Sequence, residues 1–488
     1  MLYNHIAYIS NMIGEATMHP DWVTQHKKKG TNISCIGGRY YLYAVTSVWN
    51  KEKGRAQMVN KGYLGRITED GFIPKKDKIP RPTSPVTVKE FGATNTVWEL
   101  SADIRERLIE SFGRDGEMVY AIALLRFLRT CPFKRVELSY RHSFLSELLP
   151  SLRLGGKEIS EFMRRFGENR EQLVSFMSKY VGEVGHILFD GTGITSNSDK
   201  MSTSRVGYSA KKKFDPKINL MYAFSLEAAM PVYYRVFPGN IPDMSAFQLC
   251  LQESGIKNMV VVADKGFSSD FNFELLDSGG LKYIIPLKRN SSLYDPSILK
   301  KGDKSAFEGY FMHEKRPIWY YTSKNGVVVF LNPDLKAEEE RTYICNIEAE
   351  KEGYTMSSFL EKQHTFGTIV MKTNLQTSPS DIYAYYKQRR EIEQSFDFLK
   401  NLLEQDKSYM QNEKSLETWA FINHISMLLC YKVYNILREK KLIEKYSLAD
   451  FLEHLKYISK VRINGDFVTS EITKPTKALL TAVGVHIT

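Results

Sequence analysis

Three short apolar runs in the middle of the chain constrain its fold more than any other feature. They are HILFD (186–190), NMVVVADKGF (258–267) and LKYIIPL (281–287). Helix-like segments lie before the second and third runs, and the first of these begins at Asp243, a predicted N-cap. Buried strands that alternate with helices pair in parallel. The pattern therefore predicts an α/β protein with a partly parallel sheet.

Two further blocks complete the predicted sheet. KINLMYAFSLEAAMPVYYRVFPGN (217–240) is typical of two strands joined in a hairpin. Residues 290–375 break the alternation: RPIWYYTSKNGVVVFLNP holds two strand-like runs around Asn325-Gly326, a strong hairpin signal. RTYICNIEA and FGTIVMKTN add more strand pattern. This block is predicted to be a β-rich insertion, after which the segment containing Glu393 returns to the interrupted sheet.

The rest of the chain divides into segments with different sequence patterns. Residues 39–49 and 55–67 are predicted to form a hairpin, PKKDKIPRPTSP (74–85) is typical of a linker, and the last part of the chain is predicted to be helical. The predicted segments are 1–92 (N-terminal β-rich domain and linker), 93–182 (helical region, expected to bind DNA ends), 183–289 (first part of the core), 290–375 (β-rich insertion), 376–408 (core segment with Glu393) and 409–488 (C-terminal helical region).

Composition limits the partners and the compartment. The chain has 488 residues and a net charge of +11 at pH 7, which favours a polyanionic partner such as nucleic acid. Its five cysteines are scattered without zinc-binding spacing, as expected of reduced thiols. The N-terminus lacks a signal-peptide pattern, and the most apolar long segment contains His424 and Lys432. We expect a cytoplasmic protein without a membrane span.

Two aspartates are the first candidates for chemistry. Asp190 and Asp264 each end a predicted buried strand, and the carboxyl edge of an α/β sheet is where sites are built. Glu393 is expected to return to the same point. Three carboxylates cannot all stay ionised without a cation, and hard oxygen ligands suit Mg²⁺ or Mn²⁺. A pair of such ions can activate a water or a 3′-OH for phosphodiester chemistry.

The segment YYKQRREIEQSFDFLK (385–400) supplies the remaining candidates. If it is one helix, Tyr386, Arg389, Glu393 and Lys400 share a stripe along the edge of its apolar face, whereas Glu391 points into solvent. Arg389 and Glu393 then form either an ordinary helix-edge salt bridge or part of a site in which Arg389 and Lys400 hold phosphates.

These residues resemble a known family. The spacing Tyr386-x2-Arg389-x3-Glu393-x6-Lys400 is similar to the YREK signature of DDE transposases from bacterial insertion sequences. The resemblance continues in FDGTGI around Asp190, VVADKGF around Asp264, FPGNIPD (237–243) and GYLGRI (62–67). It spans roughly residues 40–480.

The resemblance implies an RNase H-like core interrupted by an insertion, with Asp190, Asp264 and Glu393 as the catalytic ligands of two Mg²⁺ (or Mn²⁺) ions. It implies that Arg389 and Lys400 contact DNA. The function implied is cut-and-paste transposition: binding of terminal inverted repeats, cleavage at the element ends, and transfer of the 3′-OH into target DNA. A homodimer on DNA, in a prokaryotic cytoplasm and at the nucleoid, is implied as well.

Three further sites have two interpretations each, and a fourth has one. Trp319 either stacks on a flipped base, as an insertion tryptophan does in relatives, or packs in a β-sheet core. The run Lys211, Lys212 and Lys213 either touches phosphates or is a solvated charge run. Tyr386 either bonds a phosphate or packs, and His186 is interpreted as structural.

Three other functions compete with transposition. A nuclease of the same fold would cut without joining, and a strand-transfer assay on pre-cleaved ends separates the two. A catalytically silent DNA-binding derivative is disfavoured because all three acids and the Arg/Lys stripe are present. A paired-carboxylate glycosidase is disfavoured by the basic charge.

Overall fold

The computed structural model describes residues 19–51, 53–75, 86–181, 185–196, 198, 200–206, 216–241, 243–257, 259–294, 296–302, 304–403, 407–463 and 465–487. The chain forms two compact units, Met1–Pro85 and Val86–Thr488. Residues 86–92, assigned to the N-terminal domain from sequence, therefore belong to the second unit. The finer division into six segments stays a prediction.

The first unit is a small antiparallel sheet. Its elements are α1 (Asp21–Thr24), β1 (Thr31–Ile36), β2 (Arg39–Asn50), β3 (Arg55–Thr68) and β4 (Gly71–Pro74), with strand order β1-β2-β3-β4. The predicted hairpin at 39–49 and 55–67 is confirmed by the β2–β3 pairing. Its core is small and is formed by Val23, Ile33, Leu42 and Ile67.

The centre of the second unit is the predicted mixed sheet. It contains β6 (Gly185–Ser196), β8 (Pro216–Ser225), β9 (Met230–Pro238), β10 (Met259–Ala263) and β11 (Lys282–Pro286), with α9 (Asp243–Ser254), η2 (Lys265–Phe267) and α10 (Asp270–Ser278) between strands. The order is β9-β8-β6-β10-β11; β6, β10 and β11 are parallel, and β8 and β9 are antiparallel. This is the RNase H-like arrangement, as predicted.

The insertion extends this sheet and does not form a separate one. Strands β12 (Gly309–His313), β13 (Arg316–Ser323), β14 (Val327–Leu331) and β15 (Thr368–Thr373) continue from β11 in the order β12-β13-β14-β15-β11. The predicted hairpin at Asn325-Gly326 is confirmed, and both residues have positive φ (63° and 70°), as such a turn requires.

One predicted strand of the insertion is wrong. RTYICNIEA lies in α11 (Pro333–Glu348), which is followed by α12 (Met356–Lys362). The side chain of Asn332 accepts hydrogen bonds from the backbone N–H groups of Asp334 and Leu335, and Pro333 stands in the first turn. This cap and the acidic residues after it start a helix that continues through the β-branched and aromatic residues.

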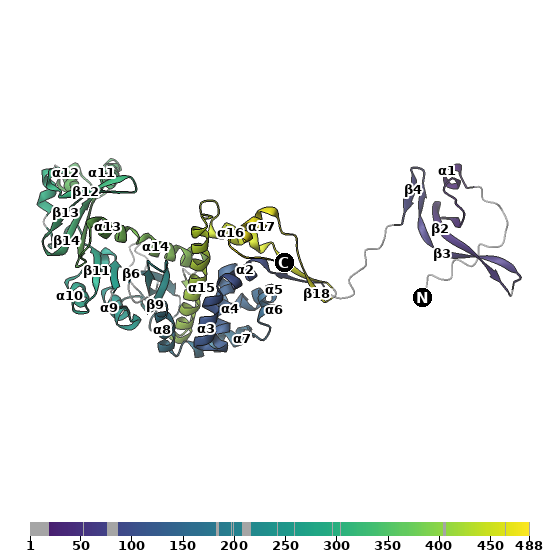
Figure 1. Cartoon of the computed structure of the whole chain (residues 1–488), viewed down its shortest axis with the longest axis horizontal. Coiled ribbons are helices and arrows are strands. Elements are labelled where there is room, and N and C mark those ends of the chain that lie inside the picture. Colours follow the sequence, from purple (N-terminus) through teal and green to yellow (C-terminus); the bar gives the residue numbers. More distant parts are fainter. Residues whose placement is uncertain are drawn as a thin grey trace. The chain divides into compact units, whose positions relative to one another are not determined.

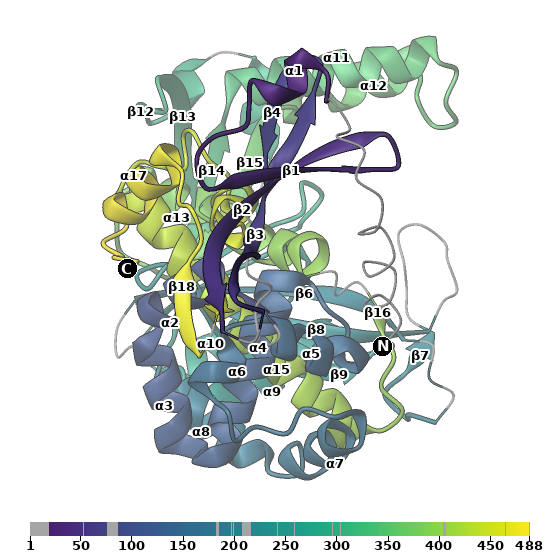
Figure 2. The same ribbon diagram turned by 90° about the vertical axis from the view of Figure 1, so that its right-hand side faces the viewer.

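A group of helices adjoins the sheet. The helices of the group are α2 (Gly92–Leu100), α3 (Ala102–Phe112), α4 (Arg114–Arg129), α5 (Val136–His142), α6 (Leu145–Leu148), α7 (Gly156–Phe166), α8 (Arg170–Ser178), α15 (Glu413–Glu439), α16 (Leu448–Lys456) and α17 (Lys474–Ala482). Within this group, α8 and α15 contact β9. Helix α15 is buried along most of its length and contacts α4, α7 and β9 (Figures 1 and 2). In the part of the chain that the structure describes, no helix combines the length and apolar character needed to cross a membrane.

The C-terminal region is helical, as predicted, but it also carries a hairpin that the sequence pattern did not indicate. Strands β17 (Ser459–Ile463) and β18 (Asp466–Thr469) form a three-stranded sheet with β5 (Thr87–Glu90). Because β5 lies far from β17 and β18 in the sequence, no local sequence pattern indicates this pairing.

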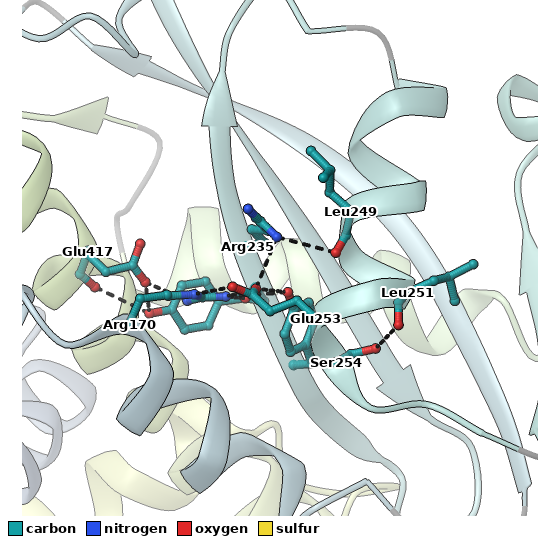
Figure 3. A network of polar contacts seen from close by, with 9 residues as sticks. Arg170, Arg235, Leu249, Leu251, Glu253, Ser254 and Glu417 are labelled. Carbon is teal, nitrogen blue, oxygen red and sulfur yellow. Dashed lines mark hydrogen bonds and ion pairs between the residues drawn. The ribbon is translucent and has the colours of Figure 1, made fainter.

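A polar network joins the helices to the sheet (Figure 3). Arg170 in α8 forms ion pairs with Glu253 of α9 at 2.9 Å and Glu417 of α15 at 2.6 Å. Its guanidinium also donates to the carbonyl oxygen of Tyr234 in β9, at 2.7 Å. One arginine therefore links the helices α8, α9 and α15 to strand β9 of the sheet.

Candidate functional site

The two aspartates meet where β10 ends. In the parallel pair β6–β10, Ala263 lies opposite Phe189; Asp190 is the next residue of β6, and Asp264 is the first residue after β10. Adjacent strands lie about 4.8 Å apart. The sequence analysis placed Asp190 at the end of its strand, and this prediction is wrong. Strand β6 continues beyond it through Gly191-Thr192-Gly193, paired with β8. The site therefore lies where β10 ends and the neighbouring strand β6 continues.

Asp190 is in an environment that disfavours its charge. Its Oδ1 accepts a hydrogen bond from the N–H of Gly191 at 2.8 Å. Burial raises the pKa of Asp190 to about 6; the Gly191 N–H and Arg389 oppose this effect, whereas the negative charges of Asp264 and Glu393 add to it. The three predicted acids thus influence one another electrostatically.

Asp264 caps the turn that follows β10. Its Oδ1 accepts a hydrogen bond from the N–H of Lys265 at 2.7 Å and forms an ion pair with Nη1 of Arg389, also at 2.7 Å. The short helix η2 begins directly after it and fixes the direction of the carboxylate.

Arg389 lies at a break in the segment that the sequence analysis treated as one helix. Helix α13 (Pro379–Lys387) ends before it, and α14 (Arg390–Asp397) begins after it. The N–H of Arg389 bonds to the carbonyl of Tyr386 at 3.1 Å, three residues back, which is a tighter turn than an α-helix makes. The single-helix prediction is therefore wrong, and its residue directions do not hold.

The break changes the roles of the two glutamates. Glu393 has 55% of its side chain exposed and accepts from Nη2 of Arg389 at 2.8 Å. Glu391, predicted to point into solvent, is only 29% exposed and pairs with Arg438 of α15 at 3.6 Å. Glu393 still faces the site, because α14 packs against β6.

The Arg389 guanidinium is the centre of the site. It bridges Asp264 and Glu393, and its charge partly opposes the rise in the pKa of Asp190. Within the described residues, no three His, Cys, Asp or Glu side chains are close enough to hold a metal ion. The donors themselves suit a hard divalent cation, because they are carboxylates that repel one another and that Arg389 only partly neutralises.

Tyr386 and Lys400 flank this centre differently. Tyr386 is half-buried in the last turn of α13, and its ring centroid lies 5.9 Å from the Arg389 guanidinium carbon. Burial raises the pKa of Tyr386, so its hydroxyl stays neutral. Lys400 lies in a π-helical segment, η7 (Phe398–Leu402). It is half-buried, and the wider turn shifts it from its predicted place on an α-helical stripe.

The structure places Trp319 within the insertion. Its ring lies 5.2 Å from that of Tyr310 and 6.4 Å from that of Phe307, with Nζ of Lys304 at 4.9 Å. These contacts fit the packing interpretation, and no described contact joins Trp319 to the three acids. Lys211, Lys212 and Lys213 lie outside the described residues.

The sequence analysis interpreted His186 as structural but did not predict the contacts it makes. The ring of His186 stacks on Tyr385 at 3.7 Å, and its Nδ1 contacts Glu227 at 2.7 Å. The backbone N–H of His186 also donates to Glu227. Because Tyr385 precedes Tyr386 in α13, this stack attaches α13 to the start of β6. The two adjacent tyrosines, Tyr385 and Tyr386, were the sequence feature that could have indicated this contact.

The chain was compared with protein families, with curated proteins and with solved structures. A family model described as "Transposase DDE domain" matches residues 184–429, about half of the chain. A comparison with curated proteins found no match.

Similar solved structures include the piggyBac transposase synaptic complex with hairpin DNA, at 12% identity and a TM-score of 0.38, covering 76% of this chain and 82% of that one. They also include the Mos1 transposase paired-end complex with left transposon end, at 10% identity and a TM-score of 0.15, covering 58% of this chain and 81% of that one. Both TM-scores are low, so the fold assignment rests on the strand order described above.

Proposed function

Because the chain belongs to the transposase DDE domain family, we propose that it cuts DNA at the ends of a mobile element and joins the freed 3′-OH to target DNA. The observation that carries this proposal is the charge-coupled group of Asp190, Asp264 and Glu393 around Arg389. The finer assignment to the YREK group of bacterial insertion sequences rests on the Tyr386, Arg389, Glu393 and Lys400 spacing.

We propose that the three acids hold two Mg²⁺ or Mn²⁺ ions. When bound, such ions lower the pKa of an attacking water or 3′-OH and stabilise the leaving oxygen. The chain contributes the fixed positions of the acids: β6 and β10 set the two aspartates, and α14 brings the glutamate. The break at Arg389 directs its side chain toward both Asp264 and Glu393.

We propose that Arg389, Tyr386 and Lys400 hold the DNA backbone beside these acids. A guanidinium presents a planar fork that matches phosphate oxygens, and a neutral tyrosine hydroxyl donates to them. In the DNA-free protein, the carboxylates of Asp264 and Glu393 take the place of those phosphates as partners of Arg389. The net charge of +11 supports binding of terminal inverted repeats and target DNA, and we propose a homodimer on DNA.

Cleavage assays on DNA duplexes carrying the sequences that flank the gene test this proposal. Asp190→Asn, Asp264→Asn and Glu393→Gln should each abolish cleavage while duplex binding survives. Asp270→Asn is the matched control, because Asp270 is an exposed aspartate in α10, close in sequence to Asp264. Glu391→Gln is unsuitable as a control, because Glu391 packs against Arg438. Cleavage that survives in any of the three variants removes that residue from the site.

A second assay separates transposition from simple cutting. Pre-cleaved ends with a free 3′-OH are incubated with a supercoiled target and Mg²⁺. We expect joined products from the wild-type chain and none from Asp264→Asn. Cutting without joining would favour the nuclease, and binding without either reaction would favour a silent derivative.

A further inference from the structure

The β2–β3 hairpin of the first unit extends beyond the sheet to which it belongs. β1 pairs with β2 only over Arg39–Ala44, and β4 pairs with β3 only over Gly65–Thr68. Within the described residues, no third strand pairs with residues 46–51 and 53–61, here called the outer ribbon (Figure 1). An isolated two-stranded ribbon is marginally stable in water. A ribbon of this length points to a partner that covers it.

The outer ribbon exposes apolar and basic side chains together. Val48, Trp49, Met58 and Val59 are exposed by 51%, 64%, 62% and 45%. From residue 39 to 68 the sequence holds six Lys or Arg and a single acidic residue. A surface of this charge is complementary to a polyanion.

The strand register divides the outer ribbon into two faces. Directly opposed residues share a face, and the pairs Thr46–Val59, Val48–Gln57 and Asn50–Arg55 lie on the same one, here called the amide face. It combines two amides, one guanidinium and several methyl groups. The side chains of Asn50 and Gln57 bond to each other at 3.1 Å, which holds both amides in place.

Three lysines stand around this face. Lys51 and Lys53 lie in the turn between the strands, and both are exposed. Lys61 is the extra residue of a β-bulge, since Ala44 pairs with Gly62 and Val45 pairs with Asn60. Bulges increase the twist of a ribbon and redirect a side chain. Positive charge therefore lies at both ends of the amide face.

We infer that the outer ribbon lies in the major groove of DNA with its amide face on the base edges. The inference rests on the proposed function, since it names how the same enzyme selects its DNA. The major groove admits a two-stranded ribbon, in which Asn and Gln pair with adenine, Arg pairs with guanine, and apolar side chains contact the thymine methyl group. Lys51, Lys53 and Lys61 contact flanking phosphates, which position the ribbon without reading sequence.

Selection and chemical interference test the inference on the full-length chain. Duplexes with a randomised centre are selected by binding, and the winners are treated with dimethyl sulfate, which methylates guanine N7 in the major groove and adenine N3 in the minor groove. We expect guanine N7 methylation to block binding, and Arg55→Ala to remove that block and weaken the selected site about ten-fold. Interference confined to adenine N3 would overturn the assignment to the major groove.

A charge-matched pair of triple variants separates the ribbon from bulk charge. Changing Lys51, Lys53 and Lys61 to alanine should reduce the slope of log affinity against log salt by about 0.9 for each phosphate that is no longer neutralised. The control changes Lys27, Lys28 and Lys29, three exposed lysines of the same unit that lie before β1. Equal reductions in both triple variants would contradict the inference.

Two further arms distinguish this inference from the proposed function. Asp190→Asn should keep the selected sequence preference while cleavage is lost. If the wild-type chain cleaves and selects DNA but ribbon variants select the same sequences with equal affinity, the ribbon inference fails and the proposed function stands. A Trp49→Ser variant that binds DNA normally but loses self-association would also overturn it, by identifying a second copy of the chain as the partner.

Discussion

Arg389 forms an ion pair with Asp264 at 2.7 Å, although Asp264 lies after β10 and Arg389 lies between α13 and α14, beyond the whole insertion. The same guanidinium reaches Glu393 at 2.8 Å. Two of the three proposed metal ligands therefore share one cation in the DNA-free protein. A divalent ion and Arg389 compete for these carboxylates, and each prediction about the site follows from that competition.

Replacing Arg389 should improve metal binding while it destroys DNA processing. In Arg389→Ala, the carboxylates of Asp264 and Glu393 no longer share a cation, so we expect Mn²⁺ to bind several-fold more tightly to the DNA-free protein. Cleavage should fail because the guanidinium no longer holds a phosphate. Calorimetric titration with Mn²⁺ measures the affinity, and Arg390→Ala is the control because Arg390 is its exposed neighbour. Unchanged or weaker Mn²⁺ binding would contradict the competition.

Lys400 should matter for DNA and not for folding. Lys400 is half-buried in the π-helical segment η7, and the ion pairs described for Asp264 and Glu393 are made by Arg389. Lys400→Ala is expected to keep the wild-type melting temperature and to lose cleavage or strand transfer. Lys407→Ala, which removes an exposed lysine of β16 (Lys407–Ser408), serves as the comparison. Full activity of Lys400→Ala would remove this residue from the site.

The Arg170 network should be essential for stability. Arg170→Ala removes the cation that Glu253 and Glu417 share in a mostly buried place; Glu253 keeps Arg235 at 3.4 Å, and Glu417 loses the ion pair described for it, so we expect a cost of about 3 kcal/mol. Arg141→Ala removes an exposed pair with Glu137 and should cost about 1 kcal/mol at most. Urea unfolding followed by circular dichroism compares the two. Similar destabilisation of both variants would show that the network contributes little.

Stability should fall in mild acid because of His424. This residue is fully buried in α15 between Tyr222 and Tyr234, and neither ring nitrogen has a hydrogen-bond partner among the described residues. Burial, helped by the charge of Arg170, lowers the pKa of His424 to about 3.

The folded-state pKa of His424 is below its unfolded value, so the stabilisation is present above pH 6.5 and is lost as the pH falls toward 3. The full effect is on the order of 5 kcal/mol, since one pKa unit corresponds to about 1.4 kcal/mol. Between pH 7 and pH 5, the melting temperature of His424→Phe should therefore fall less than that of the wild type. Parallel pH profiles for the two proteins would contradict this prediction, because they would mean that the pKa of His424 is the same in the folded and unfolded chains.

Local sequence signals predicted the parts of the fold that local physics determines. The apolar runs before Asp190 and Asp264 indicated buried strands, and Asn325-Gly326 indicated a turn that needs two positive φ angles. Helix 333–348 was missed because its β-branched residues outweighed the Asn332 cap in the pattern.

Contacts between distant segments determined the rest. The break at Arg389 accompanies its ion pair with Asp264, and Glu391 is covered by Arg438 of α15. A helical projection of residues 385–400 contains neither partner, so it assigned the more buried position to the wrong glutamate. The pairing of β5 with β17 joins the two ends of the second unit and likewise has no local sequence signal.

The central claim is that Asp190, Asp264 and Glu393 form one divalent-metal site. Electron paramagnetic resonance of free Mn²⁺, titrated into the full-length chain, measures it without reference to activity. We expect binding by wild type and by Asp270→Asn, and loss of that binding in Asp190→Asn, Asp264→Asn and Glu393→Gln. Wild-type Mn²⁺ binding in any one of these three variants would contradict the claim.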